Sequence, residues 1–143
     1  MKRILLILLI GIPIFGFGQI DSIRTYHENG KLKSEGILKD GKQEGLWIRY
    51  FYNGNLSIKG NFKDNKQQGN WISYYDNGQL YLDRIYKNGK LEGIWKSYYQ
   101  NGQLNYQWNY KDGELISQKC WDEDGNKIEI YDDGSTEKKI VID

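Results

Sequence analysis

The residue types that most often carry out chemistry are scarce in this chain of 143 residues. His27 is the only histidine and Cys120 the only cysteine, so a Cys–His nucleophile pair would have to join opposite ends of the sequence. The carboxylates of Asp122, Glu123 and Asp124 cluster, but they surround a turn-forming Asp-Gly step. The sequence has no phosphate-binding glycine loop and no metal-ligand spacing. We therefore predict a protein that is not an enzyme and that holds no cofactor and no metal.

Aromatic residues at fixed spacing are the most informative feature of the chain. Trp47, Trp71 and Trp95 are 24 residues apart, and each follows a glycine by two positions. Asn-Gly pairs recur at the same step, at 29–30, 53–54, 77–78 and 101–102. A fixed period of about 20–50 residues is typical of an array of identical supersecondary units. The sequence therefore predicts a repeat protein.

Each repeat is predicted to fold as a β-hairpin centred on its Asn-Gly pair. β-prone runs flank Asn53-Gly54, and Asn-Gly is the pair that best tolerates the positive φ angles of a type I′ turn. A two-residue turn fixes the register, and the numbers of facing residues then sum to 107. Trp47 is expected opposite Gly60, and Phe51 opposite Leu56.

This register sorts the side chains of every hairpin onto two faces, as in a half-buried sheet. One face, called here the aromatic face, collects Trp47, Phe51, Trp71, Tyr75, Trp95, Tyr99 and Trp108, together with Leu56, Leu80 and Leu104. The other face is predicted to be mostly polar. It carries a row of tyrosines, Tyr50, Tyr74 and Tyr98, bordered by Ser57, Tyr81 and Asn105.

The residue expected opposite the repeated tryptophan changes along the array. The first tryptophan faces Gly60, which would let its indole lie over bare backbone. Trp71 faces Arg84, which would give a cation–π contact. Trp95 faces Trp108, which would give an aromatic pair. The simpler interpretation covers all three: the tryptophans are the core of a thin sheet.

The hairpins together predict an all-β fold, a single elongated antiparallel β-meander twisted into a curved ribbon. The predicted repeat domain spans residues 19–143. Ser117 and Lys119 replace the repeated Gly and Trp, which marks the C-terminal end of the array. The predicted hairpins cover about 23–38, 47–62, 71–86, 95–110 and 119–131, polar glycine loops at 39–45, 63–69 and 87–93 join them, and a capping strand follows at 138–143.

The N-terminus is predicted to be an export signal. Lys2 and Arg3 precede an apolar run that ends near Gly16 and Gly18, as in a secretory signal peptide covering residues 1–18. An uncleaved membrane anchor is the alternative. We expect an exported protein that is periplasmic, in the outer envelope or extracellular. Loss of the leader changes the formal net charge from +1 to −1, which gives no basis for binding nucleic acid.

The segment from Gly45 to Leu56, with copies that begin at Gly69 and Gly93, is close to the pattern G-x-W-x-x-Y-Y-x-N-G-x-L, with Phe51 in place of the second tyrosine in the first copy. This pattern resembles the MORN repeat, in the bacterial variant typical of YwqK-type antitoxins of toxin–antitoxin systems. The resemblance spans about residues 23–131. It implies hairpin repeats and a non-catalytic interaction or scaffold role, with membrane-lipid roles suggested for some eukaryotic members.

Function is therefore expected to depend on a surface. Tyrosines among short polar groups make adaptable contact surfaces, although cross-strand aromatic residues also stabilise sheets. We predict a module that binds a protein partner. The alternatives are an antitoxin or immunity protein that neutralises a toxin by binding, and a module that binds envelope glycans or lipids. The candidate partner-binding residues are Tyr50, Tyr74, Tyr98, Tyr81, Trp47, Trp71, Trp95 and Trp108.

Overall fold

The computed structural model describes residues 18–128. The predicted leader, apart from Gly18, and the predicted capping strand at 138–143 lie outside the described residues. The strands are β1 (Ile20–Tyr26), β2 (Leu32–Lys39), β3 (Lys42–Tyr50), β4 (Leu56–Lys63), β5 (Lys66–Tyr74), β6 (Leu80–Lys87), β7 (Lys90–Leu91), β8 (Gly93–Tyr98), β9 (Leu104–Lys111), β10 (Glu114–Trp121) and β11 (Lys127–Ile128).

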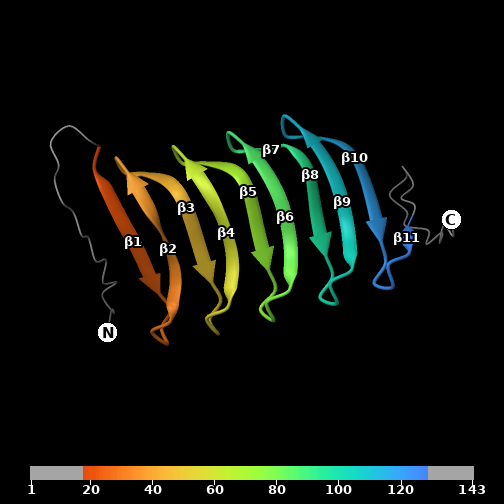
Figure 1. Ribbon diagram of the computed structural model, residues 1–143, viewed down its shortest axis with the longest axis horizontal. Coiled ribbons are helices and arrows are strands. Elements are labelled where there is room, and N and C mark those ends of the chain that lie inside the picture. The colour runs from red at the N-terminus through yellow and green to blue at the C-terminus, as the bar shows by residue number, and fades with distance from the viewer. Residues whose placement is uncertain (1–17, 129–143) are drawn as a thin grey trace.

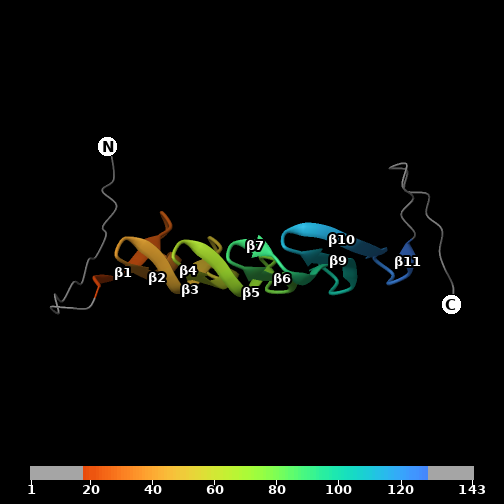
Figure 2. The ribbon, with the colours of Figure 1, turned by 90° about the horizontal axis from the view of Figure 1, so that it is seen from above.

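These strands form one antiparallel sheet in which each strand pairs with its neighbours in the chain (Figure 1). β7 and β8 together take the place of one strand, and both pair with β6. Seen from above, the sheet is a thin ribbon, with no second layer over it in the described residues (Figure 2). The predicted single β-meander is therefore confirmed.

The Asn-Gly turns differ from the predicted type I′ geometry. Only their glycines have positive φ, for example 95° at Gly54, whereas Asn53 does not. The N–H of Gly54 donates to the Phe51 carbonyl at 2.9 Å, and the N–H of Phe51 donates to the Asn55 carbonyl at 2.8 Å. These bonds define a three-residue loop, a type I turn followed by a glycine bulge. The prediction of a two-residue turn was wrong.

The asparagine side chain explains why this turn forms, and it also links neighbouring hairpins. The Oδ1 atom of Asn53 accepts the N–H of Asn55 at 2.8 Å, which closes the turn from inside. Its Nδ2 donates to the carbonyl of Asp76 in the next turn at 3.1 Å. Asn29 and Asn101 make the same link to their neighbours, to the carbonyls of residues 52 and 123.

The type I′ turns lie at the opposite edge of the sheet. Asp40 and Gly41 have φ of 51° and 76°, and the pairs 64–65, 88–89 and 112–113 also have positive φ at both positions. β2 continues to Lys39 and β3 starts at Lys42, so the predicted loop at 39–45 is a two-residue turn followed by strand. The prediction of longer polar loops was wrong, because residues 42–45 already pair with β2 or β4.

The longer Asn-Gly loop changes which face some residues occupy. Far from the turn the predicted register is confirmed, with Trp47 opposite Gly60. Between Arg49 and Tyr50 it shifts by one residue, so Tyr50 pairs with Leu56 and Ser57 is the extra residue. Because facing residues share a face, Leu56 lies beside the tyrosines and not beside the tryptophans. The same shift moves Leu80 and Leu104, which pair with Tyr74 and Tyr98.

A second irregularity explains the repeated Gly-x-Trp. Residues 45–47 of β3 lie opposite Gly36 alone, and 69–71 of β5 lie opposite Gly60 alone. Gly45 and Gly69 open these bulges with φ near 68°. Each indole then lies on the glycine of the preceding hairpin: a Cβ on Gly36 would come within 2.3 Å of Trp47, and one on Gly60 within 2.1 Å of Trp71. The indole over bare backbone was predicted, but on the wrong glycine.

The packed side chains of the sheet lie on the aromatic face. Trp47, Phe62, Trp71 and Tyr86 form a continuous edge-to-face series, with ring centroids 6.0, 4.9 and 6.3 Å apart. Trp71 is only 5% exposed, which is low for a sheet without a second layer. Its Nε1 donates to the Asn61 carbonyl at 3.1 Å. The aromatic rings therefore cover one another and act as the core.

Candidate functional site

The face opposite the aromatic face carries the candidate tyrosine row, and it is less polar than predicted. We call it the tyrosine–leucine face. Because of the register shift, tyrosine and leucine alternate from strand to strand near the Asn-Gly edge. This first row consists of Tyr26, Leu32, Tyr50, Leu56, Tyr74, Leu80, Tyr98 and Leu104.

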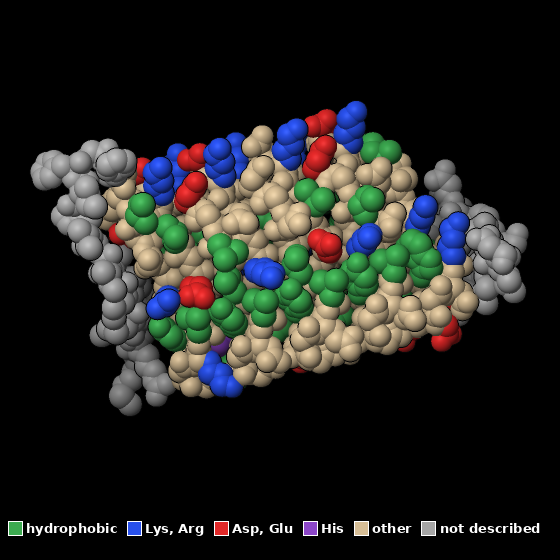
Figure 3. Space-filling view, in the orientation of Figure 1, with side chains coloured by type: hydrophobic (Ala, Val, Ile, Leu, Met, Phe, Trp, Pro, Cys, Tyr) green, Lys and Arg blue, Asp and Glu red, His purple; other side chains and the backbone are tan. Residues whose placement is uncertain are grey.

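The middle row of this face contains alternating charges. Arg24 and Glu35 form an ion pair at 3.3 Å on β1 and β2. Further along lie Lys59 on β4, Asp83 on β6 and Lys96 on β8, and the last two are register partners. Figure 3 looks onto this face and shows acidic and basic side chains alternating along a band of hydrophobic ones. In strand order, the middle row is Arg24, Glu35, Ile48, Lys59, Ile72, Asp83, Lys96 and Gln107.

The third row holds two exposed aliphatic pairs. Ile37 and Leu46 are 40% and 49% exposed, and Ile85 and Ile94 are 39% and 47% exposed. The second pair follows the first by 48 residues, which is two repeats. The repeat between them places asparagines at the equivalent positions. The row reads Ser22, Ile37, Leu46, Asn61, Asn70, Ile85, Ile94 and Asn109.

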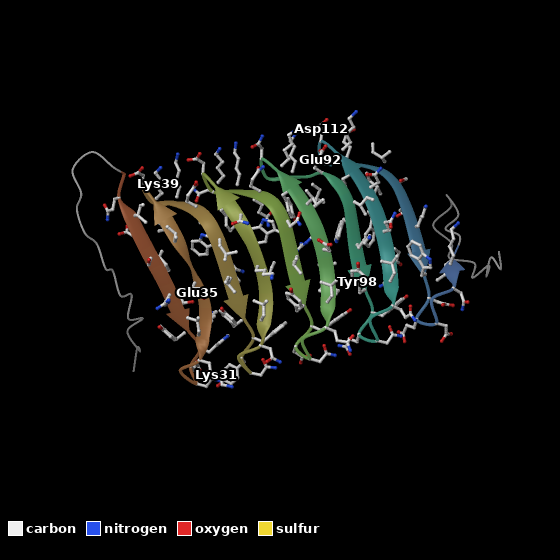
Figure 4. The ribbon with its side chains drawn as sticks, in the orientation of Figure 1. Lys31, Glu35, Lys39, Glu92, Tyr98 and Asp112 are labelled. Atoms are coloured by element: carbon white, nitrogen blue, oxygen red, sulfur yellow. The ribbon has the colours of Figure 1, made fainter. Side chains whose placement is uncertain are left out.

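The candidate tyrosines themselves are half-buried in this face. The hydroxyl of Tyr50 donates to Oε1 of Glu35 at 3.0 Å, and burial together with that carboxylate raises the pKa of Tyr50. Burial, with the carboxylate of Asp83 as a second cause, raises the pKa of Tyr98. Figure 4 shows Glu35 and Tyr98 within the sheet, while Lys39, Glu92 and Asp112 lie along one edge. The phenols are therefore held in place, with their rings half covered by neighbours.

Tyr81 does not border the tyrosine row as predicted. It is the extra residue of the bulge between β5 and β6. Its ring lies 4.8 Å from the ring of Tyr75, whose hydroxyl donates to the Tyr98 carbonyl at 2.7 Å. The extra residue interrupts the simple alternation of faces, so Tyr81 packs beside Tyr75 and not in the tyrosine row.

The candidate tryptophans lie together on the aromatic face. Trp71 is buried, and Trp47, Trp95 and Trp108 are half-buried. A hollow of about 170 Å³ lies between the first two, lined by Trp47, Arg49, Ile58, Phe62, Gln67 and Trp71. Most of the indole surface is already in contact with the protein.

Two of the predicted tryptophan contacts differ in outcome. The rings of Trp95 and Trp108 are 4.6 Å apart, so the predicted aromatic pair is confirmed. Arg84 faces Trp71 in the register, but its guanidinium lies 5.9 Å from the Tyr86 ring and Nη2 donates to Oγ of Ser73 at 2.9 Å. The predicted cation–π contact with Trp71 was wrong, because Ser73 and Tyr86 hold the guanidinium.

The two side chains most suited to nucleophilic catalysis, His27 and Cys120, lie far apart. His27 sits at the first turn, where Nε2 is 3.0 Å from the Tyr50 carbonyl, and Cys120 is buried in β10 at the other end of the ribbon. Between residues 18 and 128, no group of three or more His, Cys, Asp or Glu side chains is placed to hold a metal. No helix in this part of the chain is long and apolar enough to span a membrane.

Sequence reasoning missed the two aliphatic pairs and the leucines of the first row. The 48-residue spacing of Ile37 with Ile85, and of Leu46 with Ile94, is visible in the sequence. The faces of Leu56, Leu80 and Leu104 depend on a one-residue bulge that the pattern does not reveal.

Comparison with known protein families gives a match that covers most of the repeat array. The model described as MORN repeat variant matches residues 23–40, 43–64, 67–88 and 91–112, together more than half of the chain. Among curated proteins, no match reaches significance. Each matched segment ends at a type I′ turn and contains one Asn-Gly hairpin.

Proposed function

The chain belongs to the MORN repeat variant family, and we propose from this premise that it binds a protein partner through the tyrosine–leucine face. MORN repeats are generally modules that interact with proteins or membranes, and the family is generally non-catalytic.

The distribution of exposed apolar side chains carries the choice of surface. On the aromatic face, Trp71, Ser73 and Ser97 are at most 7% exposed. The tyrosine–leucine face leaves Ile37, Leu46, Ile85 and Ile94 between 39% and 49% exposed. Grouped exposed apolar residues rimmed by polar ones mark interaction surfaces. Alternating charges between the apolar rows add the means to select a partner.

The proposal includes export. A basic start followed by an apolar run and small residues supports a signal peptide over residues 1–18. The partner would then be met in the periplasm, in the outer envelope or outside the cell. N-terminal sequencing of the protein recovered from each cell fraction tests this. A chain that keeps residue 1 and stays in the cytoplasm would contradict export.

The binding proposal is tested by affinity capture with matched variants. We expect Ile94→Asp and Tyr74→Ala to lose the captured partner while the purified proteins remain folded. Arg49→Glu is the control, because Arg49 is also exposed but lies on the aromatic face and makes no ion pair with any described residue. Capture that survives both face variants and fails with Arg49→Glu would place the partner on the aromatic face.

A toxin is one protein partner that this surface would serve, and the repeat pattern favours it because it resembles that of YwqK-type antitoxins. Co-expression with the product of the neighbouring gene tests the idea. An antitoxin role predicts that the wild-type protein protects the cell and that Ile94→Asp does not. Retention on purified cell wall or on liposomes, with no protein captured, would instead favour the glycan or lipid alternatives.

A further inference from the structure

We propose that the tyrosine–leucine face binds a second copy of this chain, face to face, in a symmetric dimer. The inference rests on the proposed function, since it names the occupant of the same surface. It follows from the order of residues across β1–β6, β8 and β9, which are eight neighbouring strands. A two-fold axis parallel to the strands, placed between β4 and β5, brings that order onto itself in reverse.

The exposed aliphatic pairs match under this operation. The axis superposes β2 of one copy on β8 of the other, and β3 on β6. Ile37 then faces Ile94, and Leu46 faces Ile85, so each exposed pair covers the other. Between them, Asn61 of β4 faces Asn70 of β5, and two amides can exchange hydrogen bonds. Because the two pairs are 48 residues apart, the axis that exchanges them lies midway between them, at β4 and β5.

The first row matches in the same way. Because tyrosine and leucine alternate from strand to strand, an axis between two strands always places tyrosine against leucine. Tyr74 of one copy faces Leu56 of the other, and Tyr50 faces Leu80. Aromatic rings thus meet aliphatic side chains along the whole row. An axis centred on a strand would instead stack like on like.

The middle row supplies charge complementarity. Glu35 of one copy faces Lys96 of the other, and the symmetry repeats this contact. Lys59 and Asp83 face Ile72 and Ile48 of the other copy, so neither is placed directly against a charged residue. Lys59 also lies one strand from both Asp83 and Lys59 of the other copy, which have opposite charges. The two Glu35–Lys96 contacts, one on each side of the axis, are therefore the charge pairs that this arrangement aligns.

The face is large enough for a stable dimer. Eight strands at about 4.8 Å and five residues at about 3.4 Å give a projected area of roughly 650 Å² per copy. A standard interface buries about 800 Å² of accessible surface per partner. Because side chains protrude from the sheet, the accessible area of this face is larger than its projected area. Two sheets packed this way would lie about 10 Å apart and form a sandwich.

Sedimentation velocity of the purified protein over a micromolar concentration range tests the proposal. We expect a dimer whose dissociation constant rises at least tenfold with Ile94→Asp, because the residue occurs twice in the interface. Ile116→Asp is the matched control: Ile116 is 59% exposed but lies on β10, outside the eight strands. It should leave the dimer unchanged.

Charge-reversal variants test how the two copies are oriented relative to each other. Glu35→Lys and Lys96→Glu should each weaken the dimer, and the double variant should recover most of the loss, since the two residues meet only across the axis. Glu35→Lys also breaks the contact with Arg24 inside one copy, so recovery is measured in association and not in thermal stability.

The outcomes separate this inference from the proposed function. A protein that stays monomeric at every concentration overturns the dimer, and so does a dimer insensitive to Ile94→Asp or a double variant without recovery. If the monomer still captures a different protein in an Ile94-dependent way, the proposed function stands and only the identity of the partner changes. If neither association depends on Ile94, both proposals fail.

Discussion

The second and third tryptophan units differ at one residue, and the comparison shows what the repeat requires. In the second unit, Gly60 lies opposite the bulge, and Trp71 packs on it and donates Nε1 to the Asn61 carbonyl. In the third unit, Arg84 takes the place of that glycine. Trp95 instead lies against Trp108, and its buried Nε1 has no hydrogen-bond partner among the described residues.

This difference means that the tryptophan and the glycine of the preceding hairpin are one structural unit. A side chain at the glycine position fills the space that the indole needs, and the indole then packs along its own hairpin. The repeat remains folded because neighbouring rings cover the displaced indole: Trp95 also lies 5.7 Å from Tyr110.

Replacing the tryptophan of each unit with alanine should have the largest effect on stability and should show the clearest difference between the two units. Trp71→Ala should lower the free energy of unfolding by about 3–5 kcal/mol, because the ring is buried among other rings. Trp95→Ala should cost less, since that ring is half-buried and loses no Nε1 hydrogen bond. Chemical denaturation measures both. Equal losses would contradict the comparison, and a loss below ~1 kcal/mol at Trp71 would mean that the aromatic face is open.

Exchanging the residue under the indole is the next test. Gly60→Ala places a Cβ within the Trp71 ring and should cost about 1–3 kcal/mol through overpacking. The cost should vanish in a background that carries Trp71→Leu, which is the control.

In the third unit, Arg84→Gly should let Trp95 move over the backbone, and the indole N–H signal in NMR should gain protection from exchange. An unchanged signal would mean that other neighbours fix this ring.

The asparagine link between turns predicts a smaller effect. Asn101→Asp keeps the oxygen that closes its own turn but loses the donor to the Glu123 carbonyl, and should cost about 1 kcal/mol. Asn77→Asp is the matched control, because Asn77 closes its turn and makes no such link in the described residues. A similar cost at both positions would show that the link does not stabilise the array.

The smallest expected effect is a pH dependence of stability that comes from Tyr50, whose hydroxyl donates to a carboxylate. Burial and Glu35 raise the pKa of Tyr50, so the folded state holds this proton more tightly than the unfolded chain. The stability from this group is complete below the usual tyrosine pKa of about 10 and is lost as pH rises through the higher folded pKa. Urea denaturation from pH 9 to 11 should therefore show a steeper loss for wild type than for Tyr50→Phe. Parallel curves would contradict it.

The sequence alone predicts the meander, the hairpins and the face of every repeated tryptophan. The 24-residue spacing of Trp47, Trp71 and Trp95 and the strict alternation around them suffice for this. Gly36 and Gly60 follow the same spacing, so the glycines under Trp47 and Trp71 were also visible in the sequence.

The composition of the tyrosine–leucine face was not predictable in the same way. Asn-Gly suits two turns that differ by one residue in length, and the choice is made by the Asn side chain closing its own turn. That single residue decides whether Leu56 lies with tryptophans or with tyrosines. Exposure of Ile94 depends likewise on the absence of a second layer in the described residues, which no local pattern states.

Photo-crosslinking in cells tests most directly that the tyrosine–leucine face is the interaction surface. A photo-reactive amino acid is placed at Ile94 or Ile37 on that face, and at Ile58 on the aromatic face. We predict a discrete crosslinked protein, a second copy or another chain, from positions 94 and 37 and none from position 58. Crosslinks from position 58 with none from positions 94 and 37 would contradict the central claim.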